Sequence, residues 1–412
     1  MTSLNRAATG AAALLLAGAL AAGLPGPATA APAHAASPSR TAPLAATPAR
    51  TAAPARTAAA PAADCAESVP FRARTEGYRG FRIPAVVEAD GALLAFAEGR
   101  KDSLADDGDI DVVVRRSEDG GCTWGPLRVV ADAGRDTIGN PSPVVDPATG
   151  RVVLLTCRNE HGVMAHRRVF VQHGDATGTG FTPPREITAQ VKPDNWNWYG
   201  TGPGHALALR HGPHPGRLLV PANHSHRPSP GAGYRAGAHS LYSDDGGRTW
   251  QLGYVAQQSD SGLRLDENTM TELPDGRVYS NVRLQKGGSP GTRADAFLAP
   301  GGTQLLAPYR ARPELTGPVV QGSTLWADPY LVFAGPADPG ARAALTLRVS
   351  DDQGLGWRAG PQLTSGPSAY SDLVRVDADT LGVLYEKGAR SPYETLTFTR
   401  VPLAALAAPG PG

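Results

Sequence analysis

A short motif that recurs three times constrains the fold of this 412-residue chain more than any other feature. It reads "SEDGGCTW" at Ser117–Trp124, "SDDGGRTW" at Ser243–Trp250 and, in degraded form, "SDDQGLGW" at Ser350–Trp357. Asp and Gly in this pattern favour a tight turn in which Asp119, Asp245 and Asp352 accept hydrogen bonds from the local backbone. We therefore interpret these acids as turn-forming and expect each Trp to pack back on its hairpin.

Between the motifs, short apolar runs alternate with turn signals, as in "RIPAVVEADGALLAFAEG" and "SPVVDPATGRVVLLTCR". Such pairs of runs across D-G or T-G predict β-hairpins, and no long helical period interrupts them. Barrels, sandwiches and propellers are the all-β candidates. Successive motif tryptophans are separated by roughly two units of about 50 to 60 residues, the size of a four-stranded propeller blade. This spacing predicts a six-bladed β-propeller over residues 64–412.

The N-terminal segment is typical of an export signal. Arg6 precedes the apolar stretch "AATGAAALLLAGALAAGL" and the small-residue stretch "PATAAPAHAA", which predicts a signal peptide over residues 1–30. A membrane anchor is the alternative, but the stretch is short, rich in Ala and Gly, and interrupted by Pro25. Residues 31–63 are mostly Ala and Pro and are predicted to be a disordered linker. No later segment could cross a bilayer, so we expect a secreted, extracellular protein.

Charge and cysteine content exclude several classes of partner. The formal net charge of +1 gives no reason to expect nucleic acid or an anionic membrane. Cys65, Cys122 and Cys157 allow one disulfide and a free thiol, or no disulfide, and their spacing does not match a zinc site. His224 and His226 in "NHSHRP" lack a carboxylate or Cys companion at ligand spacing. We expect neither a metal nor another cofactor.

Six motifs, taken in order, carry a resemblance to a known family. They are "FRIP" (Phe81–Pro84), the acidic segment "DDGDID", the three repeats, "DENTMTELPDGRVYSNVR", an arginine before the third repeat, and "AYSDL" followed by "LYE". In this combination the chain resembles the bacterial exo-α-sialidases (neuraminidases) over nearly all of residues 69–402. The resemblance implies a propeller with the site on its central axis, a sialylated glycan as partner, and a monomer.

The resemblance also explains why Arg82 stands between Phe81 and Ile83 at the start of an apolar strand, where an unpaired charge is costly. Sialic acid carries a carboxylate on its anomeric carbon, and guanidinium groups bind that anion bidentately. The family uses three arginines, which match Arg82, Arg283 and Arg342 here, with Arg348 close to Arg342 in sequence. Glu386 matches the acid that pairs with the first arginine. Arg100 matches a position that reaches the hydroxyl side of the sugar.

The catalytic assignments follow from the same anion. A carboxylate nucleophile would be repelled by the substrate carboxylate, and sialidases use Tyr instead. Tyr370 in "SAYSDL" matches the family nucleophile, and Glu267 in "LDENTMTEL" matches the acid that takes its proton. Alignment with the family pattern places the general acid/base at Asp106, with Asp107 as the alternative if the loop differs by one residue. The other acids of the segment, Asp102, Asp109 and Asp111, are interpreted as solvated or turn-forming.

The expected activity is a retaining exo-α-sialidase that removes terminal sialic acids from glycoproteins, glycolipids and oligosaccharides. A trans-sialidase or an anhydro-forming sialidase shares the same core residues and is the alternative among enzymes. A non-catalytic propeller that binds sialylated glycans, or another propeller with the same repeat, is the alternative from other classes. In "NWNWYG", Trp196, Trp198 and Tyr199 could form an apolar wall for the leaving sugar, or could be a packed hairpin tip.

Overall fold

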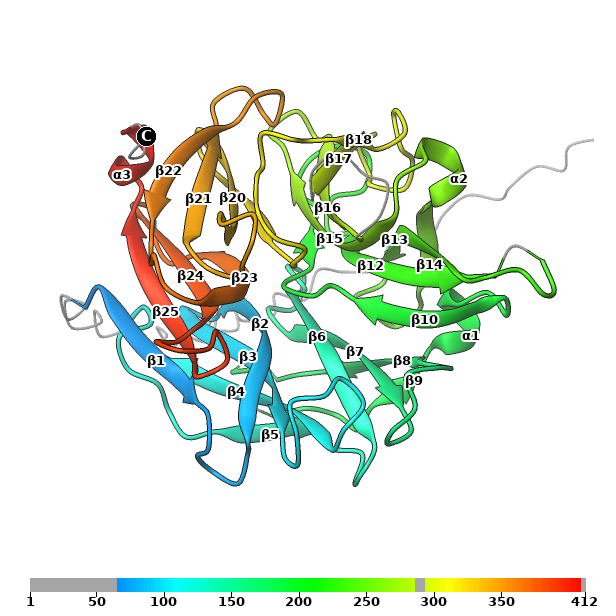
Figure 1. The fold of residues 1–412 in the computed structure, drawn as a ribbon, viewed down its shortest axis with the longest axis horizontal. Coiled ribbons are helices and arrows are strands. Elements are labelled where there is room, and N and C mark those ends of the chain that lie inside the picture. Colours follow the sequence, from blue (N-terminus) through cyan, green and yellow to red (C-terminus); the bar gives the residue numbers. More distant parts are fainter. Residues whose placement is uncertain (1–64, 176, 179, 228, 286–292, 409–412) are drawn as a thin grey trace, which may run out of the picture. The chain divides into compact units, whose positions relative to one another are not determined.

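Coordinates come from a computed structural model, which describes residues 65–175, 177–178, 180–227, 229–285 and 293–408. All of these lie in the unit Ala58–Gly412. The signal peptide and linker predicted for residues 1–63 lie outside the described residues. Within that unit the fold is an all-β propeller whose strands are joined mostly by short turns (Figure 1).

The largest sheet runs in the order β2-β3-β4-β6-β7-β8-β9, with β5 paired to β4. Its two antiparallel halves meet through one parallel bridge, between Ile110 and Thr137. The strands are β2 (Gly80–Ala89), β3 (Ala92–Arg100), β4 (Ile110–Ser117), β5 (Arg128–Ala131), β6 (Thr137–Val145), β7 (Val152–Asn159), β8 (Arg168–His173) and β9 (Arg185–Glu186).

Four smaller antiparallel sheets complete the fold. One holds β10 (Trp196–Thr201), β11 (Leu207–Ala208), β12 (Leu218–His226), β13 (Arg235–Ser243) and β14 (Gln251–Gln257). The next two hold β15 (Leu265–Glu272), β16 (Val278–Leu284), β17 (Arg293–Leu298) and β18 (Arg310–Ala311), and then β19 (Ser323–Ala327), β20 (Tyr330–Pro336), β21 (Leu345–Ser350) and β22 (Arg358–Gln362). The last holds β1 (Glu67–Arg72), β23 (Ser368–Arg375), β24 (Thr380–Lys387) and β25 (Thr395–Pro402).

The prediction of six separate blades was therefore wrong as a count of sheets. The described residues form five sheets, because the Ile110–Thr137 bridge joins β4 to β6 and merges two four-stranded units. A pattern of hairpins does not show whether two neighbouring units share one backbone bridge. The prediction of an all-β propeller is confirmed.

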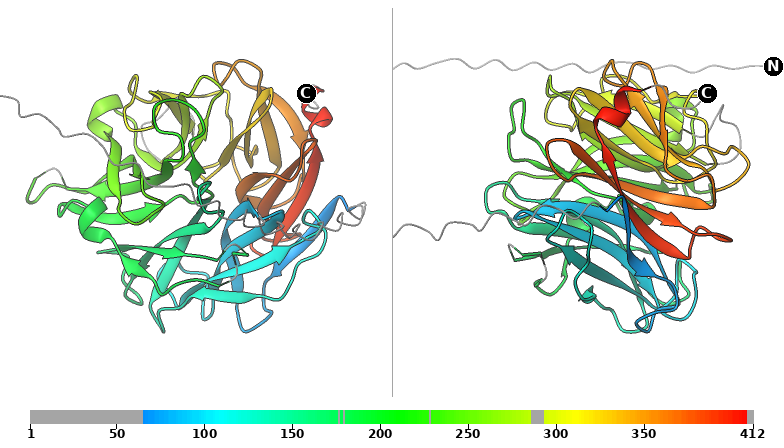
Figure 2. Two further views of the ribbon diagram at one scale, coloured as in Figure 1. Left: turned by 180° about the vertical axis from the view of Figure 1, so that it is seen from behind. Right: turned by 90° about the vertical axis from the view of Figure 1, so that its left-hand side faces the viewer.

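Neighbouring units pack against one another around the ring. Contacts run from β2 to β6, from β6 to β10, from β12 to β15, from β15 to β19, from β19 to β23, and from β23 back to β2. Figures 1 and 2 show β1, in blue, beside β25, in red, so the first and last strands share a sheet. A disulfide between Cys65 and Cys122, with Cα atoms 5.6 Å apart, joins this sheet to the neighbouring turn. Cys157 is a free, buried thiol.

Apolar clusters fill the spaces between successive sheets, as the alternating apolar pattern of the strands requires. One such cluster, which includes Leu155, Val220 and Trp250, packs the eight-stranded sheet against the sheet of β10–β14. Another, which includes Val332, Leu347 and Val383, packs the sheet of β19–β22 against the last sheet. The turn between β2 and β3 illustrates the local signal. Asp90 and Gly91 have φ of +50° and +74°, as a type I′ hairpin turn demands of its two central residues.

The repeated motif forms turns, as its composition predicts. Asp245 accepts hydrogen bonds from the backbone amides of Arg248 (2.9 Å) and Thr249 (2.9 Å), from the Thr249 hydroxyl (2.6 Å) and from Ser243 (2.8 Å). Asp119 makes the equivalent bonds to Thr123 and Ser117. The interpretation of these acids as turn-forming is confirmed, and they are committed to backbone donors.

Helical structure is confined to three four-residue turns among the described residues: α1 (Thr188–Val191), α2 (Gln258–Ser261) and α3 (Ala404–Ala407). Within that part of the chain, none of the helices has the length and apolar character to span a membrane.

Candidate active site

Five of the strands that line the ring carry a register shift near the same end. The shifts fall between Arg82 and Ala85 in β2, Gly139 and Ser142 in β6, Trp196 and Tyr199 in β10, Leu265 and Asn268 in β15, and Ser368 and Ser371 in β23. A bulge leaves residues unpaired and turns their side chains away from the regular pleat. Glu267 and Tyr370 both lie inside such a bulge. The bulges therefore turn side chains from different sheets toward one common site.

Tyr370 lies at the centre of this site. Its phenol oxygen donates to Glu267 Oε1 at 2.6 Å and accepts a hydrogen bond from Arg283 Nη1 at 3.2 Å. Arg283 also donates to Glu267 Oε2 at 2.7 Å. Burial raises the pKa of the Tyr370 phenol well above its usual range, and the charge of Glu267 adds to this, while Arg283 and Arg82 act in the opposite direction. The free site therefore holds a protonated phenol with a carboxylate in position to receive its proton.

Arg82 is buried and pairs with Glu386. The distances are 3.0 Å from Nε to Oε1 and 3.4 Å from Nη2 to Oε2. Glu386 also accepts the backbone amides of Ile83 and Tyr370, both at 3.2 Å. Ile83 has φ of +56°, a rare conformation for a β-branched residue. The hydrogen bond from its backbone amide to Glu386 helps to hold this conformation. Glu386, on β24, thus fixes the bulges of β2 and β23 to each other.

The three arginines expected to bind a carboxylate surround one tyrosine. Arg82 Cζ lies 5.0 Å from the centre of the Tyr370 ring, Arg342 Cζ lies 5.6 Å from it, and Arg283 contacts its hydroxyl. We call Arg82, Arg283 and Arg342 the arginine triad. Arg348 lies inside β21, paired in register with Phe333 and Ala359, and has no contact with Tyr370 among the described residues.

Asp106 is the acid of its loop that faces this cluster. Its Oδ1 lies 2.7 Å from Arg100 Nη2 and 3.6 Å from Arg82 Nη1. Burial raises the pKa of the Asp106 carboxyl, but the charges of Arg100 and Arg82 outweigh it, so the net pKa is lowered. Its side chain is 55% exposed, whereas that of Arg100 is 1% exposed, so a substrate could reach the acid while the arginine stays fixed.

The other acids of this segment have different surroundings. Asp109 and Asp111 both pair with Lys101, at 3.1 and 3.0 Å. Asp102 lies 3.9 Å from His161 Nε2. Asp107 contributes its backbone carbonyl to Gly162. None of these four is paired with Arg82 or Arg100 among the described residues.

Two residues that the sequence analysis missed hold this arrangement. Glu98 accepts two hydrogen bonds from Arg100 (3.0 and 2.6 Å) and one from the backbone amide of Asn140 (2.8 Å), whose φ is +53°. Glu98 in β3 thus binds the bulge of the next unit as Glu386 does in β24. Tyr393 accepts a hydrogen bond from Arg342 at 2.9 Å and lies under Arg82, with Cζ 4.5 Å from its ring centre. For Glu98, its place in "AEGR" next to Arg100 was a weak sequence signal of a role in the site. For Tyr393, the sequence carried no such signal.

The aromatic segment of β10 is mostly core. Trp196 is 5% exposed and Tyr199 is fully buried, so the idea that both contribute to a wall for the leaving sugar was wrong. Trp198, inside the bulge, is half-buried and lies against Arg167, whose Cζ is 4.2 Å from its ring centre. His224 stacks on Trp196 and lies 3.0 Å from His239, Nδ1 to Nδ1. No group of three potential metal ligands occurs among the described residues.

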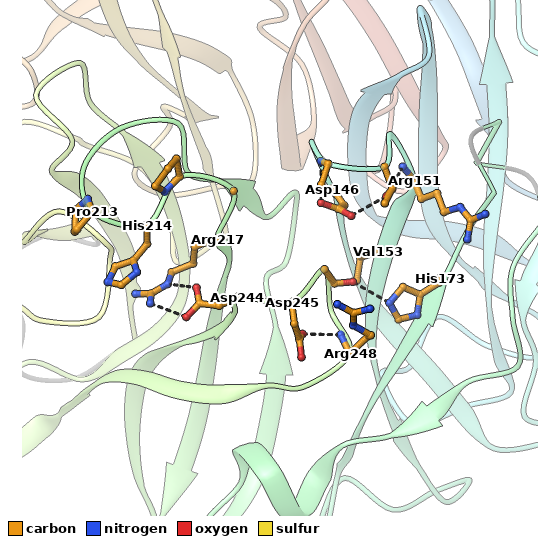
Figure 3. Close-up of a pocket in the computed structure, with 15 residues that line it drawn as sticks. Asp146, Arg151, Val153, His173, Pro213, His214, Arg217, Asp244, Asp245 and Arg248 are labelled. Carbon is orange, nitrogen blue, oxygen red and sulfur yellow. Dashed lines mark hydrogen bonds and ion pairs between the residues drawn. The ribbon is translucent and has the colours of Figure 1, made fainter. Parts of the chain in front are cut away.

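A large cleft lies elsewhere. It has a volume of ≈ 830 Å³ and lies between the β6–β7 turn, the loop before β12 and the second repeat. Figure 3 shows Arg217 facing Asp244, and Asp146 and Arg151 on the opposite side. These turns lie at the strand ends opposite the bulges, and no residue of the arginine triad or its acids lines the cleft. The chemistry of the side chains, and not cavity size, therefore identifies the candidate site.

Comparisons with known proteins identify relatives of this chain. The model of the BNR repeat-like domain matches residues 91–383. A sialidase of Micromonospora viridifaciens is 34% identical over 346 residues, which cover 77% of this chain and 51% of the relative. An exo-alpha-sialidase of Aspergillus fumigatus is 30% identical over 307 residues, which cover 67% of this chain and 69% of the relative.

This chain belongs to the sialidase family with BNR repeats. It spans about half the length of the Micromonospora sialidase. A Hadza microbial sialidase has the same fold, with a TM-score of 0.71, 24% identity, and coverage of 82% of this chain and 69% of that one.

Proposed function

We propose that this protein is an exo-α-sialidase that hydrolyses terminal sialic acids on glycoproteins, glycolipids and oligosaccharides with retention of configuration. The observation that carries the proposal is the position of Tyr370. Its hydroxyl lies 2.6 Å from a carboxylate, and three guanidinium groups surround it. Binding an anion needs only the arginines. A phenol paired with a base is the additional element that nucleophilic catalysis requires.

In the first step, the triad binds the substrate carboxylate, and this places the anomeric carbon beside the Tyr370 oxygen. As that oxygen attacks, its proton passes to Glu267, so the phenol never has to ionise alone. Asp106 donates its proton to the departing glycosidic oxygen. The bond from the anomeric carbon to the Tyr370 oxygen replaces the bond to the aglycone, which leaves as an alcohol.

In the second step, Asp106 is a carboxylate and takes a proton from water. The water oxygen attacks the anomeric carbon, the aryl glycosidic bond to the Tyr370 oxygen breaks, and Glu267 returns the proton to Tyr370. Two inversions give net retention. Arg100 positions Asp106, and Glu386 positions Arg82, because each pair is held by direct hydrogen bonds or ion pairs.

Three further features belong to this proposal. The eight-stranded sheet counts as two blades joined by one bridge, which makes a six-bladed catalytic propeller over residues 64–412. The protein is secreted and acts as a monomer. The disulfide between Cys65 and Cys122 supports export, because such bonds persist mainly in oxidising compartments.

One experiment tests the activity. The full chain is incubated with an aryl α-sialoside, aglycone release is followed by absorbance, and the anomer first formed is identified by proton NMR. We expect the α-anomer of free sialic acid. A 2,7-anhydro sugar, or transfer to added lactose, would identify the alternative reactions. Binding of the sialoside without turnover would indicate a glycan-binding protein instead.

A further inference from the structure

A second pocket lies beside the candidate active site. It has a volume of ≈ 570 Å³ and is lined by the loop between β1 and β2, the loop after β3, and the loop between β24 and β25. The first and last of these loops are joined by a hydrogen bond from the Ala73 amide to the Glu394 carbonyl, at 2.9 Å. All three loops are at the bulge end of the strands. We call this the basic pocket.

Four arginines line the basic pocket: Arg72, Arg74, Arg79 and Arg390. All four are exposed, and none of their guanidinium groups makes an ion pair or hydrogen bond within the described part of the chain. The single carboxylate in the pocket, Glu394, accepts the backbone amides of residues 389, 390 and 391 at 3.1, 2.8 and 3.0 Å. With four guanidinium groups and one carboxylate, the pocket carries an excess of positive charge, and no group of the described residues pairs directly with these guanidinium groups.

The loop after β3 also holds acids, but none of them lines the pocket. The acid of the loop between β1 and β2 is committed elsewhere. Glu76 pairs with Arg115 Nη2 at 2.5 Å, and Arg115 does not line the pocket. Like charges gathered around one hollow repel one another, so their placement has a cost unless an anion binds there. Exposed arginines scattered over a surface would have no such cost.

The basic pocket is continuous with the site through two residues. Tyr393 lines it and also contacts Arg82 and Arg342 of the triad. Leu104 lines it and offers its carbonyl to Arg100, and it precedes the candidate acid Asp106 by two residues on the same loop. Asp106 must contact the glycosidic oxygen to protonate it. The part of the glycan beyond that oxygen therefore leaves the site on the side of this loop.

We propose that the basic pocket binds a second anionic group, carried by the aglycone of the substrate. This inference rests on the proposed function and narrows it to sialosides with an additional negative charge next to the terminal sugar. Guanidinium groups bind carboxylates and sulfates in the same bidentate way. The anion could thus be the carboxylate of a second, internal sialic acid or a sulfate ester, and the two sources require different substrates in the test.

The test compares kcat/KM for three substrates: sialyllactose, α2,8-linked disialyllactose and a sulfated sialyllactose. The pocket variant is Arg79→Gln with Arg390→Gln, one change in each of two loops. The matched control is Arg151→Gln with Arg248→Gln, which removes the same charge at the distant cleft of Figure 3. We expect the pocket variant to lose about tenfold in kcat/KM on a dianionic substrate. Sialyllactose should change less than about twofold, and the control should leave all three values in place.

The outcomes separate the possibilities. Loss on disialyllactose alone identifies a carboxylate partner, and loss on the sulfated substrate alone identifies a sulfate. Equal ratios of kcat/KM in the wild type and the pocket variant overturn the inference. If the wild type cleaves no sialoside at all, the proposed function fails, and calorimetric binding of disialyllactose then replaces kinetics. Equal affinity of the wild type and the pocket variant in that measurement also overturns the inference.

Discussion

The phenol oxygen of Tyr370 and the carboxylate of Glu267 lie 2.6 Å apart, although the two residues come from different sheets. Each sits in a bulge of the first strand of its unit. The short distance depends on the backbone of both bulges, and Arg283 donates to both side chains and holds them together. The proposed nucleophile and its proposed base are thus already in contact in the free protein.

Tyr370→Phe removes the attacking oxygen and keeps the ring that Arg82 and Arg342 contact. We expect turnover of natural sialosides to fall by about three orders of magnitude or more, as for other lost nucleophiles. Thermal unfolding should change little. Mass spectrometry after trapping with a fluorinated sialic acid should find the adduct on Tyr370 of the wild type.

Tyr385→Phe is the matched control for that change. Tyr385 is also fully buried, but its hydroxyl contacts Thr399 inside the blade. This variant should lose about 1 kcal/mol of stability and keep its activity. A trapped adduct on a residue other than Tyr370, or full activity in Tyr370→Phe, would show that another group attacks.

Arg82→Lys replaces a planar fork by a point charge. The two bonds to Glu386 require the fork geometry, and so would a bidentate bond to the substrate carboxylate. We expect an unsaturated sialic-acid analogue to bind about 2 kcal/mol more weakly, roughly 30-fold in inhibition constant. An unchanged inhibition constant would mean that Arg82 does not contact the carboxylate.

Arg342→Lys and Arg348→Lys form a matched pair six positions apart in sequence. Arg342 contacts Tyr393 and lies beside the Tyr370 ring, while Arg348 lies within β21. The first change should weaken binding of the same analogue by about tenfold, from the loss of one charge-assisted contact. The second should leave binding unchanged. The reverse result would assign the third arginine of the triad to Arg348.

Local signals in the sequence predicted the fold class well. The turn chemistry of Asp119, Asp245 and Asp352 depends on neighbours within a few residues, so the repeat could be interpreted without tertiary information. The bridge between Ile110 and Thr137 depends on how two units pack, and this is why the number of separate sheets was mispredicted.

The site was predictable only where a family motif carried it. Glu98 and Tyr393 hold the arginines of the site in place, but their positions depend on bulges and on a folded loop. No short sequence pattern specifies either feature. Tyr393 reaches the triad because Glu394 folds its loop back onto three backbone amides. Trp196 and Tyr199 show the opposite failure, because aromatic residues next to a site resemble a binding wall even when they are core.

The paired histidines should make the protein sensitive to acid. Burial, with a smaller effect of His226, lowers the pKa of His224 to about 3, and burial and His224 lower that of His239 well below its usual value. In the unfolded chain, each of these two histidines takes up a proton near pH ~6.5. Stability is therefore fully present above pH 6.5 and is lost as the pH falls from there toward about 3. His224 should cost roughly 2 to 3 kcal/mol by pH ~4.5, and His239 should add to the loss in the same direction.

Urea unfolding from about pH 7 to pH 4.5 measures this loss. His224→Asn removes one titrating group and keeps an acceptor near His239, so its stability should fall less steeply than that of the wild type. His214→Asn, at an exposed histidine of the distant cleft, is the control and should follow the wild type. Equal slopes for His224→Asn and the wild type would exclude the buried pair as the cause. His205 contributes to the pH dependence of stability with the opposite sign, because Asp372 raises its pKa by more than burial lowers it. This contribution is the same in both proteins and cancels when their slopes are compared.

Asp106→Asn should reveal the general acid through the leaving group. A phenol with a low pKa departs without a proton, whereas a sugar hydroxyl needs one, so sialyllactose should slow far more than an activated aryl sialoside. The ratio of the two losses should be about 100-fold or more. Asp107→Asn, one residue along the loop, is the control. If Asp107→Asn shows this selectivity and Asp106→Asn does not, the acid is Asp107.

In the wild type, Arg100 and Arg82 lower the pKa of Asp106 against the effect of burial. If a substrate carboxylate binds Arg82, it neutralises that charge and raises the pKa of Asp106. Since the acid must be protonated to act, kcat/KM, which reports the free enzyme, should decline at a lower pH than kcat. Coincident declines would mean that substrate binding does not change the charge around Asp106.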